Sequence, residues 1–198
     1  MQILHPFAGS VQQYLAQLDD QESPRPRRCP QCEAKQPLTA HGFYLRTIID
    51  AAFDGEVRVR RYLCEACRRT VSLLPDFALP YLRSSVTVIA SWLLARLLSA
   101  SPPPPTPPSP PMPYQRGQFW LRRFRAQAEA LCVALAPLAK PGAAPGFGHR
   151  ALTMLQAIGW IAAHRFLFAD LRAHLLGWPP SLAPGGRRRT LGPASAPA

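Results

Sequence analysis

Acidic residues and lysine are both scarce in this chain of 198 residues. Its 11 acidic residues are outnumbered by 23 basic ones, which gives a formal net charge of +12, and only Lys35 and Lys140 among the basic residues are lysine. The planar guanidinium of arginine binds phosphate groups and guanine edges in a bidentate manner. The charge excess predicts a polyanionic partner, with nucleic acid favoured over a membrane surface. A GC-rich genome also enriches arginine together with alanine, proline and glycine, so the preference over lysine has a mutational explanation as well.

Long apolar runs are absent too. The two longest candidates, residues 86–98 and 151–163, are shorter than the roughly 20 residues that a bilayer requires, and Arg96 interrupts the first. Residues 1–8 have neither the basic start nor the sustained apolar stretch of a secretory signal. These features predict a soluble, cytoplasmic protein of one or two small domains, with no membrane partner.

Carboxylates nearly disappear after the first third of the chain. Beyond Asp76, only Glu129 and Asp170 remain. A metal-dependent phosphoryl-transfer core needs three carboxylates that converge on two metal ions, and no nucleophile–base motif occurs elsewhere. The sequence therefore predicts a protein without catalytic activity.

Cysteine is rare, yet four of the five cysteines occur as two CxxC pairs. Cys29 and Cys32 form the first pair, Cys64 and Cys67 the second, and 31 residues separate them. One CxxC turn directs two sulfurs to a point, and two such turns complete the tetrahedral site of a structural Zn²⁺. The separation exceeds the about 15–20 residues of compact four-cysteine sites, but it suits a ribbon with long strands. Four ligands leave no position for water, so the predicted zinc is structural and not catalytic.

A disulfide pair and a redox CxxC motif are the alternatives. Both are weaker, because no secretory segment indicates an oxidising compartment and no βαβ pattern surrounds either pair. His41 is the nearest alternative ligand, and we interpret it as a structural or surface residue because four cysteines already fill the site. Cys132 lies among apolar residues and is predicted to be buried and inert.

The order of patterns along the chain predicts an α+β fold, with a small three-stranded zinc ribbon followed by a helical, helix-turn-helix-like region. Ser10 and Gln13 form a capping box for a first helix, and Ser84 or Ser85 caps a helix that starts at residue 86. The hairpin turn is expected at Asp54-Gly55. The predicted strands are 41–49, 57–63 and 70–74.

We divide the chain into five parts. They are an N-terminal helix and linker (1–28), the zinc ribbon (29–83), a helical region (84–139), an apolar C-terminal helical segment (140–178) that breaks near His164, and a disordered basic tail (179–198). A proline-rich run (101–113) interrupts the helical region and is expected to form an extended polyproline II rod. It is interpreted as a stiff linker or insertion, with a docking site for SH3- or WW-like domains as the alternative.

Arginines gather in two of the predicted elements. The second strand alternates so that Arg58 and Arg60 share one face. A helix over 114–139 combines arginines with bulky aromatics and carries only Glu129 as an acid, which is typical of helices that contact a groove or clamp phosphate; a solvated charged face is the alternative. The candidate nucleic-acid-binding residues are Arg58, Arg60, Arg61, Arg68, Arg69, Arg116, Arg122, Arg123 and Arg125.

Three stretches together resemble an uncharacterised bacterial domain family: Leu38 to Tyr44 (LTAHGFY), Arg60 to Pro75 (RRYLCEACRRTVSLLP) and Leu79 to Arg83 (LPYLR). Its members are similar to transposase-associated proteins that place a zinc ribbon before a helix-turn-helix. The resemblance covers roughly residues 1–100, and residues 113–125 more loosely. It implies that Cys29, Cys32, Cys64 and Cys67 are zinc ligands and that the protein binds DNA in connection with mobile elements.

The leading hypothesis is therefore a zinc-ribbon DNA-binding protein, related to transposases or associated with mobile elements, that has no catalytic activity of its own. The alternative is a zinc-stabilised adaptor for protein–protein interaction, in which the apolar C-terminal helix forms a homo-oligomer interface. RNA is the alternative nucleic-acid partner, because ribbons bind both nucleic acids.

Overall fold

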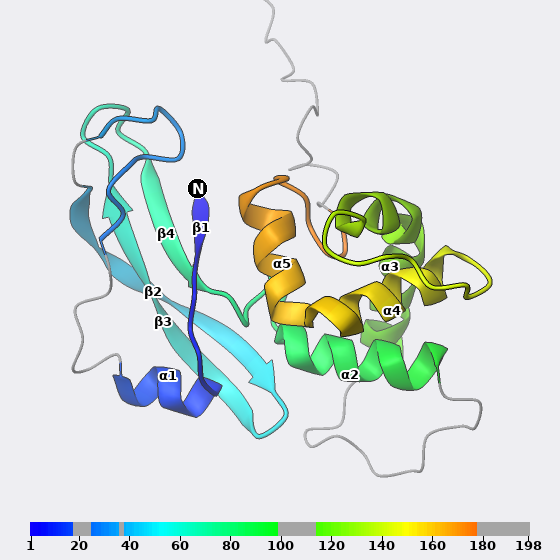
Figure 1. The fold of residues 1–198 in the computed structure, drawn as a ribbon. Helices are drawn as coiled ribbons and strands as arrows, with labels where there is room; N and C mark the ends of the chain where they lie inside the picture. The colour runs from blue at the N-terminus through cyan, green and yellow to red at the C-terminus, as the bar shows by residue number, and fades with distance from the viewer. Residues whose placement is uncertain (18–24, 36–37, 99–113, 178–198) are drawn as a thin grey trace, which may run out of the picture.

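The computed structural model describes residues 1–17, 25–35, 38–98 and 114–177. Within them the chain forms a four-stranded sheet, a short helix at one end of that sheet, and a group of four helices beside it (Figure 1). The α+β prediction is confirmed. The elements are β1 (Gln2–His5), α1 (Val11–Gln17), β2 (Thr39–Asp50), β3 (Phe53–Leu63), β4 (Thr70–Pro75), α2 (Val86–Leu97), α3 (Tyr114–Leu135), α4 (Phe147–Ile158) and α5 (Trp160–Ala169).

The sheet has the strand order β1-β4-β3-β2, so the expectation of three strands is wrong. β1 pairs in parallel with β4, with Gln2 opposite Ser72, and the other neighbours are antiparallel. The N-terminal ammonium of Met1 donates a hydrogen bond to the carbonyl of Thr70 at 2.9 Å. This strand escapes sequence analysis because it is only four residues long and its partner lies about 70 residues away along the chain.

The hairpin between β2 and β3 turns at Ala51-Ala52, because Asp50 pairs with Phe53. The turn expected at Asp54-Gly55 is wrong, since these two residues belong to β3 and pair with β2. The observed register lets Ile48 and the buried valines of β3 join one core cluster. Gly55 provides space for a ring, since a Cβ there would lie 2.9 Å from the Phe53 side chain.

The two faces of the sheet are buried at opposite ends. Val11 and Tyr14 of α1 cover one face, which carries Val57, Val59 and Leu74. The α1 capping box is confirmed: Ser10 N–H donates to Gln13 Oε1 at 2.7 Å, and Gln13 N–H donates to Ser10 Oγ at 3.2 Å. The opposite face is covered at the other end, where a cluster contains Cys29, Leu38, Tyr62, Cys64, Val71 and Leu73.

A connector, residues 76–85, joins the sheet to the helices. Its Arg83 carbonyl accepts from Ile49 N–H at 2.7 Å, and its Ser85 N–H donates to the Ile49 carbonyl at 2.9 Å, so the connector runs along the outer edge of β2. The expected cap of α2 is confirmed at Ser85, whose Oγ accepts from Val88 N–H at 3.1 Å and donates to Asp50 Oδ1 at 2.5 Å. These bonds fix where the helical group starts relative to the sheet.

The helical group encloses its own core, which includes Leu93 of α2, Phe124 of α3, Leu152 of α4 and Leu167 of α5. The apolar C-terminal segment was expected to break near His164, but it breaks at Gly159, where α4 and α5 meet at 101°. Gly159 has φ +89°, a backbone conformation that glycine adopts without a steric penalty. His164 instead lies inside α5 and is buried.

No single helix in the described ranges is long and apolar enough to cross a membrane; α4 and α5 meet those criteria only when they are taken together across their bend. The predicted proline-rich rod (101–113) and the predicted basic tail (179–198) lie outside the described residues. The same holds for the segment between α2 and α3, so the helix-turn-helix stays a prediction.

Gly117 lies at a tight contact between α3 and α2. A Cβ at this position would lie 2.3 Å from the ring of Trp92, which packs edge-to-face on Trp120 at 6.0 Å between ring centroids. We expect Gly117→Ala to lower the free energy of unfolding by about 1–3 kcal/mol, because overpacking a tight contact shifts both helices. Thermal unfolding followed by circular dichroism measures the effect.

The matched control is Gly148→Ala in α4, where nothing lies within 4 Å of the new Cβ. This substitution should leave stability unchanged or raise it, since alanine is the better helix former. Equal melting temperatures for the two variants would contradict the assigned packing.

Candidate functional site

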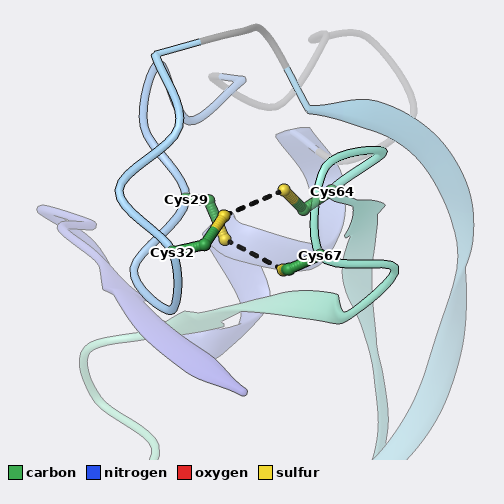
Figure 2. A group of neighbouring side chains, drawn as sticks. All are labelled: Cys29, Cys32, Cys64 and Cys67. Carbon is green, nitrogen blue, oxygen red and sulfur yellow. Dashed lines mark hydrogen bonds between the residues drawn. The ribbon is translucent and has the colours of Figure 1, made fainter.

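The four paired cysteines converge at one end of the sheet. Cys29 and Cys32 come from the loop that precedes β2, and Cys64 and Cys67 come from the turn between β3 and β4; the four side chains point toward one another (Figure 2). All four Sγ atoms lie within 4.8 Å of each other. Within the described ranges, this is the one group of three or more His, Cys, Asp or Glu side chains placed to hold a metal ion.

The sulfur spacing fits a metal ion and not a disulfide. The Sγ–Sγ distance is 3.8 Å between Cys29 and Cys67 and 3.6 Å between Cys32 and Cys64. Four sulfurs placed tetrahedrally at about 2.3 Å from an ion are separated by about 3.8 Å, whereas a disulfide bond is about 2.05 Å long. The site can therefore hold a metal ion with these cysteines as its ligands.

Hydrogen bonds within the backbone form the first loop. Cys29 N–H donates to the Ala34 carbonyl at 3.1 Å, and Glu33 N–H donates to the Cys29 carbonyl at 2.9 Å. Glu33 adopts φ +59°, in the left-handed region. This tight turn brings the two sulfurs of the CxxC pair to the same side of the loop.

The second loop repeats this arrangement. Cys64 N–H donates to the Arg69 carbonyl at 2.9 Å, Arg68 N–H donates to the Cys64 carbonyl at 2.8 Å, and Arg68 has φ +57°. The left-handed position follows the second cysteine in both loops. Neither loop has glycine at that position, so the sequence carries no local signal for it.

The backbone also donates to sulfur. Burial raises the pKa of Cys29, but hydrogen bonds from the backbone N–H groups of Cys32 and Gln31, together with those from the Cys64 and Cys32 thiols, outweigh it and bring the pKa to about 7. For Cys32 the Ala34 N–H lowers the pKa, but burial and the neighbouring thiols outweigh this and raise it to about 12. The neighbouring sulfurs thus move the pKa values of Cys29 and Cys32 in opposite directions, and a bound cation would favour the thiolate form that a metal ligand needs.

The site is part of a core. Cys29 and Cys64 are 0% and 2% exposed and pack in one cluster with Leu38, Tyr62 and Val71. An ion here would join the loop before β2 to the β3–β4 turn. Its role would be to hold this end of the sheet together.

Comparison with known families agrees with this geometry. Residues 29–102 match the model of a family described as a domain of unknown function (DUF6431). The matched segment starts at the first cysteine ligand and includes both CxxC pairs. The match and the clustered cysteines confirm the resemblance to an uncharacterised domain family with a zinc-ribbon-like site. No curated protein and no solved structure matches the chain.

The arginines of β3 lie next to exposed apolar side chains of β2. Phe43 is paired with Arg60 and Leu45 with Arg58 across the two strands. The Arg58 guanidinium lies over the Phe43 ring at 3.8 Å, while Phe43 and Leu45 are 47% and 57% exposed. We call these four residues the ribbon face. Such interleaving of arginine with aromatic surface suits contact with nucleic acid.

The other predicted arginines of the sheet lie nearer the metal site. Arg61 belongs to the opposite face of β3 and donates to Thr70 Oγ1 at 3.5 Å. Arg68 is exposed and pairs with Glu65 at 2.7 Å. Arg69 is exposed in the same turn.

The arginines of α3 are separate from this group. Figure 1 shows α3 in the helical group and β3 in the sheet, with α5 between them. Arg123 donates from Nε to the Leu176 carbonyl and from a terminal nitrogen to the Gly177 carbonyl, both at 2.6 Å, so it anchors the segment after α5. Arg122 and Arg125 are exposed, and Arg116 is half-buried. The structure does not bring the two arginine groups together.

Two further arginines were not singled out from the sequence. Arg46 of β2 and Arg83 of the connector line one pocket. They lie 37 positions apart in the chain, and although Arg83 ends the LPYLR stretch quoted above, only the folded chain relates it to Arg46.

Proposed function

We propose that this protein is a zinc-stabilised nucleic-acid-binding protein whose partner is duplex DNA and which has no catalytic activity of its own. The observation that carries the proposal is the ribbon face, in which the exposed Phe43 and Leu45 lie beside the half-buried Arg58 and Arg60, on the same sheet as a four-cysteine metal site. The metal ion would stabilise the end of the sheet at which β3 and β4 are joined, and β3 carries Arg58 and Arg60.

Zinc is the ion that this donor set favours. Four thiolates in tetrahedral array select Zn²⁺ or iron among the common metals, and Zn²⁺ is the usual ion in closed Cys₄ sites. Because all four positions are filled by sulfur, the ion offers no site for water or substrate. Metal analysis of the purified protein, with one zinc and no iron per chain as the expected content, tests this assignment.

Charge supports the choice of partner. The chain carries a net charge of +12, and arginine side chains suit the phosphate backbone of a duplex. Arg68 and Arg69 are exposed in the second metal loop, and Arg122 and Arg125 are exposed on α3. We assign the main contact with a duplex to the ribbon face, where the Arg58 guanidinium lies over the exposed Phe43 ring.

In this proposal the protein binds DNA and catalyses no reaction. Among the described residues, Asp76 is the buried carboxylate; it accepts from Phe7 N–H at 3.2 Å and pairs with Arg165 at 3.5 Å, so both of its oxygens are occupied. The resemblance of the quoted motifs to transposase-associated proteins supports a role connected with mobile elements.

The test is a fluorescence-anisotropy titration of a random duplex with the double variant Arg58→Ala/Arg60→Ala. We expect weaker binding, and we expect the slope of log affinity against log salt to fall by about 2, one for each lost phosphate contact. Arg96→Ala is the matched control, because Arg96 is an exposed arginine on α2 that lies away from the ribbon face.

An equal loss of DNA affinity in the double variant and in Arg96→Ala would show that the ribbon face is not the DNA-binding surface. Absence of salt-dependent binding in the unmodified protein would favour the adaptor alternative, in which Phe43 and Leu45 dock a protein. A parallel titration with duplex RNA of the same sequence decides between the two nucleic acids.

A further inference from the structure

An open pocket of about 390 Å³ lies where β1, β2 and the connector approach one another. Its lining combines cations, phenol rings and hydrogen-bonding groups. The lining residues are Gln2, Tyr44, Arg46, Thr47, Tyr81, Leu82 and Arg83. None of them belongs to the metal site or to the ribbon face.

Arg46 is a half-buried cation of this pocket. Its guanidinium donates from one terminal nitrogen to the carbonyls of Leu79 and Leu82, the latter at 2.6 Å. No carboxylate in the described ranges pairs with it. Burial lowers the pKa of Arg46, which is the cost of holding a charge without a counter-ion. An anion in the pocket would compensate that charge.

Arg83 supplies a second cation at the rim. Its backbone is fixed by the hydrogen bond from Ile49 N–H to its carbonyl at 2.7 Å, whereas its side chain is exposed and forms no ion pair within the described part of the chain. Two guanidinium groups from separate elements can contact different oxygens of one phosphate. This arrangement selects a phosphate over a singly charged carboxylate.

Tyr81 adds an exposed aromatic ring beside the two arginines. It is 54% exposed although its neighbours Leu79 and Pro80 are buried, and it has φ +64°. A bulky residue rarely adopts this conformation, which costs of order 1–3 kcal/mol and recurs at ligand sites. The strained backbone holds the ring at the mouth of the pocket, where a planar base can stack on it.

The size of the pocket suits a small ligand group. A volume of about 390 Å³ is at the lower end of small-molecule sites. This is enough room for one nucleotide. The chemistry and the volume together indicate a phosphate joined to one flat ring.

We propose that this pocket binds a single unpaired nucleotide, with its phosphate between Arg46 and Arg83 and its base on Tyr81. The inference deepens the proposed function, because an unpaired nucleotide of a bound strand is one source of this ligand; a free mononucleotide is the other. Duplex binding through the ribbon face and nucleotide binding in the pocket use different residues and can be tested apart.

The test titrates the zinc-loaded full chain with 5′-AMP and with inorganic phosphate by calorimetry. Arg83→Ala should weaken AMP binding at least tenfold, and Arg96→Ala should not change it. Tyr81→Gly removes the ring and also relieves the positive φ, so the variant keeps its fold. It should weaken AMP binding while leaving phosphate binding unchanged. Arg58→Ala/Arg60→Ala should bind AMP as the unmodified protein does.

A labelled single-stranded oligonucleotide then identifies the source. If the oligonucleotide displaces AMP, the natural ligand is an unpaired nucleotide of a strand. If AMP stays bound in its presence, the natural ligand is a free nucleotide. Both outcomes agree with nucleotide binding in the pocket. Absence of AMP binding at millimolar concentration, or equal binding by Arg83→Ala and Arg96→Ala, would overturn the inference. The ribbon-face titration reports on the proposed function independently of this result.

Discussion

Replacing Cys64 with serine should abolish metal binding and unfold the metal end of the sheet. Cys64 is 2% exposed and its sulfur lies 3.6 Å from that of Cys32, so the variant leaves three ligands and a buried hydroxyl. Structural zinc contributes about 10–16 kcal/mol of apparent binding free energy in zinc-finger peptides, which is comparable to the whole stability of a domain. The loss should therefore exceed the effect of any other single substitution considered for this protein.

Two measurements localise the effect. Metal content per chain should fall from one to zero, and amide hydrogen exchange should become fast in Cys64 to Leu74, which includes the β3–β4 turn. Cys132→Ser is the matched control, because Cys132 is a buried cysteine of α3 outside the metal cluster. Retention of one metal ion in Cys64→Ser, with unchanged exchange in the turn, would contradict the assigned ligands.

Acid should destabilise the helical group through two buried histidines. Burial, with the nearby His174 as a smaller cause, lowers the pKa of His164 to about 3. Burial also lowers the pKa of His174 to about 4, against the hydrogen bond to Pro80. Because the ordinary value is about 6.5, the unfolded chain binds more protons than the folded chain between these values. Stability is therefore complete above about pH 6.5 and is lost as the pH falls toward 4.

The free energy of unfolding should fall steeply as the pH is lowered. Each histidine contributes about 1.4 kcal/mol per pH unit in this window, so the pair contributes roughly 3 kcal/mol per unit. His164→Leu should flatten the slope by about half. It should also leave stability at pH 7 unchanged or raised, because neither ring nitrogen of His164 has a hydrogen-bond partner in the described part of the chain.

Urea unfolding at several pH values between 7 and 4.5 measures the slope. His41→Gln serves as the control substitution, because His41 is an exposed histidine of β2 that lies outside the helical group. A His164→Leu variant with the slope of the unmodified protein would show that this histidine is not the one that limits acid stability.

Local chemistry explains which parts of the fold could be predicted. The CxxC pairs, the Ser10–Gln13 capping box and the Ser85 cap each depend on a few adjacent residues, and the structure confirms them. β1 could not be predicted, because its pairing with β4 depends on a partner far along the chain. The Ala51-Ala52 turn was missed because the sheet register selects it, although Asp54-Gly55 has the stronger turn propensity.

The roles of the individual arginines could not be predicted from the sequence either. Composition indicates a basic surface, but only the structure separates arginines by their contacts. Arg46 and Arg123 donate to backbone carbonyls of distant segments, while Arg58 lies over the Phe43 ring and Arg83 stands at the rim of a pocket. These differences arise from contacts between residues far apart in the sequence, so no local pattern reveals them.

The most direct test of the account is the affinity of the zinc-loaded protein for a random duplex, measured by anisotropy across salt concentrations and repeated after the metal is removed with a chelator. Micromolar or tighter binding that weakens steeply with salt, and that is lost without the metal, is the predicted result. Flat curves at low salt, or equal affinity with and without the metal, would contradict a metal-held ribbon that presents its arginines to DNA.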